Sequence, residues 1–261
     1  MSEDAVVTEL RAGALWARLN RTEALNSINY ELLAGLEAAM DEAVASQDAH
    51  ALVITGSGRA FCAGADLAFL EGAGAEDDAF NRFLADVGET FRRLELLPLP
   101  TIAAINGFAL AGGLELVLCC DLAIAAEEAK IGDAHANFGL LPGGGGSVRL
   151  SRRVGPTLAK QLMFTGDFLP SKALLGSGLL NDVVPGDRLE GTVDDIVGMI
   201  AAKSPLGLRR MKQLVDDSLQ QTVDAGLRAE LMASALHAHS ADMAEGLAAF
   251  REKRTPEFTD N

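Results

Sequence analysis

The sequence predicts an α/β fold with a parallel sheet in its main domain and a helical region at its C-terminal end. Short apolar runs rich in β-branched residues alternate with segments of helical periodicity in the first half of the chain. This strand–helix–strand order requires parallel pairing with right-handed crossovers. Helical patterns dominate the second half. We therefore expect a core domain over residues 1–195 and a helical region over residues 196–261.

The elements of the first half follow from their apolar patterns. Residues 14–21 alternate as a strand does, and residues 29–45 carry apolar residues at helical spacing. The run ALVITGSG at 51–58 has the composition of a buried parallel strand ended by glycines. The patterns that follow predict a small-residue loop over 58–67, a helix over 79–97, a strand over 100–109, a short helix over 113–120 and a strand over 121–126.

A glycine-rich loop, LLPGGGGSVRL at 140–150, separates these elements from a helical second half. The loop has no Lys-Ser/Thr pair after its glycines, which argues against a nucleotide P-loop. Beyond it the periodicity predicts helices over 156–165, 171–175 and 194–202, and a long helical stretch over 205–250.

The composition limits the classes of partner. The 261 residues carry a formal net charge of −15, which disfavours nucleic acid and anionic membranes as partners. No apolar run reaches the roughly 20 residues that span a membrane. Cys62, Cys119 and Cys120 form neither a disulfide framework nor a zinc pattern. The acidic N-terminus, MSEDAVVTEL, is unlike a signal peptide, so we expect a cytoplasmic protein with reduced thiols.

The segment NGFALAGGLELVLCCD at 106–121 places a carboxylate in an otherwise apolar helix. A helix that begins near Gly112 offers free N–H groups, which favour a negatively charged oxygen. Glu115 lies three residues later, on the same helix face as Gly112. One turn can therefore hold both an oxyanion donor and a carboxylate. The alternative is a glutamate that only complements the helix dipole.

The segment RAFCAGADL at 59–67 supplies a second set of exposed backbone groups. Phe61 can anchor this loop in the core, while the small residues after it leave the backbone bare. A turn through Gly64 would present adjacent N–H groups. Two backbone donors from separate loops, aimed at one carbonyl oxygen, form an oxyanion hole. The second donor would come from Gly112.

These motifs resemble those of the enoyl-CoA hydratase/isomerase (crotonase) superfamily, and the resemblance covers nearly the whole chain. Any one segment is moderately specific, whereas five in the same order are strongly specific. The matching segments are LNRTEALNSIN (19–29), ALVITGSGRAFCAGADL (51–67), PTIAAINGFALAGGLELVLCCDLAIAA (100–126), AKIGDAHANFGLLPGGGGSVRLSRRVG (129–155) and EGLAAFREKRTPEF (245–258).

The resemblance implies a crotonase-like spiral of ββα units, with the C-terminal helices forming a homotrimer or a hexamer built from two trimers. The substrate would be an acyl-CoA thioester whose oxygen accepts hydrogen bonds from the N–H groups of Ala65 and Gly112. Glu115 matches one of the two glutamates of the family's hydratases. No metal or redox cofactor is implied, because CoA arrives as part of the substrate. The residues implied to contact CoA are Arg21, Ala24, Ala63, Asp66, Leu67 and Lys253.

The second glutamate of the hydratase pattern is replaced by His135 in the segment GDAHANFG. A neutral imidazole is available at pH 7 and can act as a base, or it can only hydrogen-bond the substrate or water. Asp133 shares a face with His135 if the segment is extended, so it can orient the imidazole or serve as the second acid itself. Both side chains can instead be loop polar groups that satisfy the backbone.

We therefore expect an enoyl-CoA hydratase-like lyase in which Glu115 is the principal acid/base group and His135 the second group. The departure at His135 leaves a Δ3,Δ2-enoyl-CoA isomerase open, because one carboxylate can move one proton between carbons. An acyl-CoA hydrolase is a further alternative. A non-catalytic acyl-CoA-binding subunit is the alternative outside enzymes. The segment 68–85 is expected to line the acyl pocket.

Overall fold

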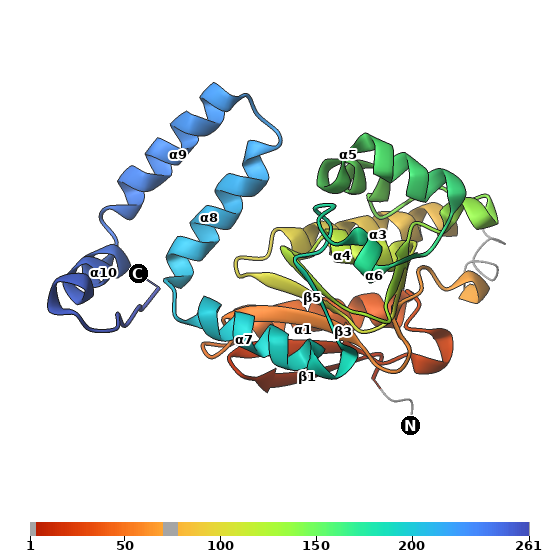
Figure 1. The fold of residues 1–261 in the computed structure, drawn as a ribbon, viewed down its shortest axis with the longest axis horizontal. Coiled ribbons are helices and arrows are strands. Elements are labelled where there is room, and N and C mark those ends of the chain that lie inside the picture. Colours follow the sequence, from red (N-terminus) through yellow and green to blue (C-terminus); the bar gives the residue numbers. More distant parts are fainter. Residues whose placement is uncertain (1–3, 70–77, 261) are drawn as a thin grey trace.

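The computed structural model describes residues 4–69 and 78–260. Its centre is a six-stranded sheet with the order β1-β2-β3-β5-β7-β10 (Figure 1). β1 is antiparallel to β2, whereas all the other neighbours are parallel, as expected for strands joined by crossovers. The strands are β1 (Val6–Arg11), β2 (Ala14–Leu19), β3 (Ala51–Gly56), β5 (Thr101–Ile105), β7 (Leu122–Ala126) and β10 (Asp182–Val184).

A smaller four-stranded sheet with the order β4-β6-β8-β9 forms a second layer. Three times in succession the chain gives one strand to the large sheet and the next to the small sheet, and then continues into helical structure. This repetition is the spiral of ββα units that was predicted. The strands are β4 (Ala60–Cys62), β6 (Phe108–Leu110), β8 (Lys130–Gly132) and β9 (Leu169–Pro170).

The strand predicted over 100–109 is wrong in one respect, because the structure divides it between the two sheets. Asn106 separates β5 from β6: its side chain accepts a hydrogen bond from Gly56 N at 2.9 Å and donates one to Gly58 O at 3.0 Å. A Cβ at Gly107 would collide with the carbonyl group of Arg59. The loop predicted over 58–67 likewise contains β4. These turns carry the chain from one layer to the other.

The helices of the core match the predicted periodicity most closely where the apolar stripe is longest. α1 buries Leu32, Leu33 and Leu36 on one face, and Asn29 caps it by accepting from Leu32 N at 3.0 Å. In the described residues, no helix has both the length and the apolarity to cross a membrane. The core helices are α1 (Tyr30–Ala45), α3 (Ala79–Glu95), α4 (Gly112–Leu118), α5 (Gly146–Thr165), α6 (Ser171–Leu174) and α7 (Leu189–Ala201).

Two elements differ from their prediction. β1 was not predicted, because its sequence VVTELR mixes apolar and charged residues. α5 begins at Gly146 rather than near Pro156. Gly155 interrupts the helix with φ +78° and ψ 159°, so the expected start marks its second segment.

The long helical stretch predicted over 205–250 consists of three helices that stand apart from the core (Figure 1). Each helix is capped by a serine or threonine whose side chain accepts from the backbone N–H three residues on: Ser204, Thr222 and Ser240. We call α8 (Pro205–Ser218), α9 (Val223–His237) and α10 (Ala241–Glu252) the C-terminal arm. The boundary expected after residue 195 falls inside α7, which packs on the large sheet, so the arm begins near Ser204.

Candidate active site

The site is built around α4, whose seven residues are all buried. The helix approaches β4 so closely that a Cβ at Gly113 would collide with the carbonyl oxygen of Cys62. Glu115 lies one turn into this helix and is 3% exposed. A carboxylate in such a place carries a desolvation cost unless other groups compensate it.

The two loops that sequence analysis paired do converge. Gly64 lies against the start of α4: a Cβ on Gly64 would sit 3.4 Å from Gly112 N, and a Cβ on Gly112 would sit 3.6 Å from Ala65 N. Within residues 4–69 and 78–260, neither the N–H of Ala65 nor that of Gly112 donates to a protein oxygen. Two backbone donors from separate loops are therefore close together and free to bind one acceptor.

The peptide that carries the Gly112 N–H is held in an uncommon conformation. Ala111 precedes it with φ +49° and ψ −119°, a region that alanine rarely adopts. The N–H of Ala111 donates to Gly132 O at 3.0 Å, which ties the turn to β8. Such backbone strain costs on the order of 1–3 kcal/mol and is concentrated at functional sites. Here it accompanies the orientation of a free N–H at the start of α4.

The glycine-rich loop holds the carboxylate of Glu115, which the sequence did not reveal. Gly146 N donates to Glu115 Oε1 at 2.8 Å, and the backbone of Gly144 also lies against the carboxylate and helps to lower its pKa. A Cβ at Gly144 would lie 2.9 Å from Glu115 Oε2. Gly146 is the first residue of α5, so the carboxylate also lies at the positive end of a helix.

His135 lies between the two acids of the site. Its Nδ1 is 3.1 Å from Asp133 Oδ1, and its Nε2 is 3.9 Å from Glu115 Oε2. All three side chains are buried. Asp133 and His135 are thus in contact, as the sequence allowed, although Ala134 between them is left-handed rather than extended. A carboxylate at Nδ1 fixes that nitrogen as the donor and leaves Nε2 directed at Glu115.

The pKa values of Glu115 and His135 are both raised above their ordinary values. Burial raises the pKa of Glu115 above its ordinary value, although the N–H groups of Gly146 and Gly144 and the charge of His135 oppose this. Burial alone would lower the pKa of His135. The hydrogen bond and charge of Asp133, together with the charge of Glu115, outweigh burial and raise it. Each group lies in the field of the other, so the charge of one affects the pKa of the other.

Five of the six residues expected to contact CoA lie near the Gly64 loop. Arg21 donates to Asp66 Oδ2 at 2.9 Å and to Ser27 O at 2.5 Å, so its guanidinium braces this loop. The N–H of Ala63 donates to Leu25 O at 3.0 Å, next to Ala24. Leu67 follows Asp66 and is exposed.

Lys253 is the sixth, and the structure does not bring it to the others within one chain. It follows α10 at the far end of the arm (Figure 1).

The segment 68–85, which we expected to line the acyl pocket, lies partly outside the described residues at 70–77. The described part forms an aromatic cluster with α1: the rings of Tyr30 and Phe69 are 5.4 Å apart, and those of Phe69 and Phe83 are 5.1 Å apart. In the part of the chain that the structure describes, no three His, Cys, Asp or Glu side chains gather as metal ligands would.

The spiral fold and the paired backbone donors beside a buried glutamate define a protein of the crotonase class. The family model for Enoyl-CoA hydratase/isomerase matches residues 9–261, and the chain belongs to this family. It is 37% identical over 259 residues to the crotonyl-CoA hydratase of Syntrophomonas wolfei, with 99% of each chain covered. It is 36% identical over 258 residues to the 2,3-dehydroadipyl-CoA hydratase of Escherichia coli, again with 99% of each covered.

Solved structures agree with this assignment. The crystal structure of an enoyl-CoA hydratase from Bacillus anthracis superimposes with a TM-score of 0.92 at 35% identity. That match covers 98% of this chain and 100% of the Bacillus anthracis chain. The expected fold is therefore confirmed.

Proposed function

We propose that this protein is an enoyl-CoA hydratase that adds water across the α,β-double bond of an acyl-CoA thioester. One observation carries the proposal: the buried carboxylate of Glu115 faces His135 beside two unpaired backbone N–H groups on converging loops. Two similar proteins are named crotonyl-CoA hydratase and 2,3-dehydroadipyl-CoA hydratase, which supports the same reaction class.

The N–H groups of Ala65 and Gly112 bind the thioester oxygen. When water attacks Cβ, the electrons of the double bond move through Cα to this oxygen, and a thioester enolate forms. Two fixed donors stabilise the enolate more than the neutral thioester, because the negative charge develops on the atom that they contact. Removing one such donor costs about 3 kcal/mol in other oxyanion holes.

Glu115 and His135 divide the proton transfers. Glu115 takes a proton from the water whose oxygen bonds to Cβ, and His135 gives a proton to Cα as the enolate collapses. The protonated Glu115 then returns its proton to His135, so that the net change is the addition of one water. The raised pKa of His135 favours its protonated form, and the N–H groups of Gly144 and Gly146 support the ionised form of Glu115.

Asp133 orients His135 and stabilises its protonated form, so that the imidazole can act as the acid in place of a second glutamate. Its carboxylate accepts from Nδ1 and places the other ring nitrogen toward Glu115. Its charge stabilises the imidazolium form that donates to Cα. A histidine–aspartate pair therefore serves as the acid in this chain.

The C-terminal arm supports assembly into a trimer or a pair of trimers. It exposes a row of apolar side chains, and a cavity of about 910 Å³ separates α8 from the core. In such an assembly Lys253 would reach the CoA phosphates of a neighbouring copy, which one chain does not allow. The buried, unpaired thiols of Cys62, Cys119 and Cys120 support a cytoplasmic location.

Mass spectrometry of 2-enoyl- and 3-enoyl-CoAs incubated with the protein tests the proposal. A product of crotonyl-CoA that is heavier by one water, and that is absent with Glu115→Gln, supports hydration. A shifted double bond without added water would instead identify an isomerase, and free CoA would identify a hydrolase. Binding of acyl-CoA with no product would leave a non-catalytic subunit.

A further inference from the structure

The N-terminal turn of α5 contains an arginine that contacts three parts of the fold. Arg149 donates from Nε to Glu95 Oε1 at 3.2 Å and from Nη2 to Glu95 Oε2 at 3.0 Å. Its Nη1 donates to Gly144 O at 2.7 Å. Glu95 is the last residue of α3, so one guanidinium ties α3, α5 and the glycine-rich loop together. A bidentate pair of this kind fixes direction as well as distance.

The loop that Arg149 holds is the loop that binds the carboxylate of Glu115. Gly145 adopts φ +97° between Gly144, whose carbonyl Arg149 binds, and Gly146, whose N–H binds Glu115, and a Cβ on Gly145 would collide with the guanidinium. Four consecutive glycines, Gly143–Gly146, have little conformational preference of their own. Their N–H groups point at Glu115 only if something else fixes the peptide planes. By binding the carbonyl of Gly144, Nη1 of Arg149 fixes the peptide between Gly144 and Gly145, which directly precedes the peptide that carries the Gly146 N–H.

We propose that Arg149 is a positioning residue for Glu115: anchored on Glu95, it holds the Gly144 carbonyl and thereby directs the glycine N–H groups at the catalytic carboxylate. The contact to substrate is made by Glu115, and Arg149 acts through the loop. This inference rests on the proposed function, in which Glu115 works as an ionised base. Neither the motifs of the sequence nor the family resemblance assigned a role to this arginine.

Arg149, together with Glu95 and the Gly144 carbonyl that it binds, is called the clamp below. The charge state of the clamp is consistent with a positioning role. Burial alone raises the pKa of Glu95, but the hydrogen bonds from Arg149 and Arg92 outweigh it and lower the pKa, so the pair is ionised at neutral pH. The titratable groups that face Glu115 come from several elements. They are His135 and Asp133 from the segment after β8, Cys62 from β4, Cys119 after α4, and Arg149 itself.

The variants Arg149→Met and Arg149→Lys separate positioning from charge. Loss of the clamp weakens the donors to ionised Glu115, so its pKa rises and the acid limb of the kcat/KM profile for crotonyl-CoA moves to higher pH. We expect kcat to fall by about 10- to 100-fold, as for other small displacements of catalytic groups, with a smaller change in KM. Lysine keeps the charge but cannot bind Glu95 in a bidentate manner and Gly144 together, so Arg149→Lys should behave like Arg149→Met.

Two further variants control the experiment. Arg152→Met changes an exposed arginine three residues along the same helix and should leave the profile unchanged. Glu95→Gln removes the carboxylate that anchors Arg149 and leaves Arg149 itself in place. It should move the acid limb to higher pH, by a smaller shift than Arg149→Met causes. The same variant tests the proposal if Arg149→Met does not fold. Thermal unfolding of each variant separates this effect from general loss of structure.

Infrared difference spectroscopy provides a readout that needs no turnover. The carboxylic acid band of Glu115, identified by its absence in Glu115→Gln, should persist to higher pH in Arg149→Met than in the unchanged protein. A protein that hydrates no enoyl-CoA would sink the proposed function, while this titration would still test the clamp. The clamp is overturned if the band titrates at the same pH in both proteins, or if Arg149→Lys restores kcat and the acid limb.

Discussion

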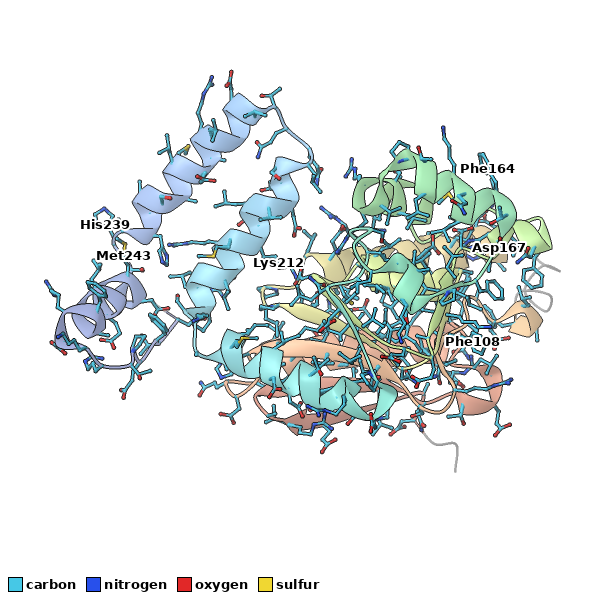
Figure 2. The ribbon with its side chains drawn as sticks, in the orientation of Figure 1. Phe108, Phe164, Asp167, Lys212, His239 and Met243 are labelled. Atoms are coloured by element: carbon cyan, nitrogen blue, oxygen red, sulfur yellow. The ribbon has the colours of Figure 1, made fainter. Side chains whose placement is uncertain are left out.

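The region around α4 and the C-terminal arm bury their residues in opposite ways. Every residue of α4 is buried, the charged Glu115 included, whereas no residue of α9 is buried. In the arm, Leu231 is 71% exposed and Phe250 is 83% exposed. Figure 1 shows the arm standing beside the core, and in Figure 2 Lys212 projects from α8 toward the core, where it binds Asp121 at 2.8 Å.

This difference separates the tasks of the two regions. The proposed catalytic groups Glu115, His135 and Asp133 lie together inside one chain, where each has a fixed partner, as buried polar groups need. The arm exposes many large apolar side chains, and exposed apolar side chains that gather in one patch mark a protein interface. Changes at α4 should therefore abolish the reaction, whereas changes in the arm should alter assembly and leave the reaction largely intact.

The largest effect is expected for Glu115→Gln. The amide cannot accept the proton from water, so kcat for crotonyl-CoA hydration should fall by about 1000-fold, the middle of the range for general acid–base groups. Steady-state kinetics measure this loss. Glu128→Gln changes an exposed glutamate and should leave kcat as it is. Equal activity in Glu115→Gln and Glu128→Gln would remove the basis for the site.

The close approach of α4 to β4 can be broken at a single glycine. Gly113→Ala places a methyl group against the Cys62 carbonyl and should lower the free energy of unfolding by about 3 kcal/mol. Gly88→Ala is the matched change, because nothing lies within 4 Å of its Cβ in α3. It should raise the free energy of unfolding by about 0.5 kcal/mol. If urea denaturation showed that both substitutions change the free energy of unfolding in the same direction, this packing would be contradicted.

A charge in the arm should weaken assembly without removing catalysis. Leu231→Glu places a carboxylate where a partner would cover an apolar residue, so the dissociation constant of the assembly should rise by about 100-fold, or roughly 3 kcal/mol. Sedimentation velocity measures this change. Leu175→Glu alters an exposed leucine outside the arm and should leave assembly intact. If Leu231→Glu lost catalysis and kept its assembly, the two regions would not have separate tasks.

The pairing of Asp133 with His135 predicts a shift in the basic limb of the pH profile. In the proposed mechanism His135 works in its protonated form, and the hydrogen bond and charge of Asp133 raise its pKa. Asp133→Asn therefore lowers the pKa of His135, so activity should be lost at a lower pH as the pH rises, with kcat about 10-fold lower at neutral pH.

A pH series of kcat measures this shift, with the exposed Asp167→Asn as the control. A basic limb that stays in place in Asp133→Asn would show that Asp133 does not support the imidazolium form.

The smallest effect is expected at the end of the arm. Lys253→Ala should raise KM for acyl-CoA by about 5-fold and leave kcat unchanged, because one partly exposed charge contact is worth about 1 kcal/mol. The exposed Lys160→Ala is the control. In the Leu231→Glu background the substitution should change nothing further, since Lys253 would then have no neighbour to reach. An equal effect in both backgrounds would place Lys253 outside any shared site.

The fold was predictable where its elements have a clear period. β3 and α1 carry apolar patterns long enough to identify their type and their buried face. The small sheet was not predicted, because strands of two or three residues show no period. The turn between β5 and β6 depends on a close contact with the carbonyl of Arg59, which lies almost 50 residues earlier. The sequence near the turn does not indicate this contact.

The site was predictable only where its residues lie close together in the sequence. Glu115 was visible as a carboxylate in an apolar helix, and Asp133 and His135 are two residues apart. The donors to Glu115 from Gly144 and Gly146 lie about 30 residues away, and glycine has no side chain to signal a contact. Strain at Ala111 was likewise invisible, because alanine is an ordinary residue in a loop.

The central claim is that His135, supported by Asp133, supplies the proton that reaches Cα. Incubation of crotonyl-CoA with the protein in deuterated water, followed by mass spectrometry and NMR of the product, measures that transfer directly. We expect one deuterium at Cα and one water gained with the unchanged protein, and neither with a folded His135→Gln variant. Hydration and deuterium uptake at the unchanged rate in His135→Gln would contradict it.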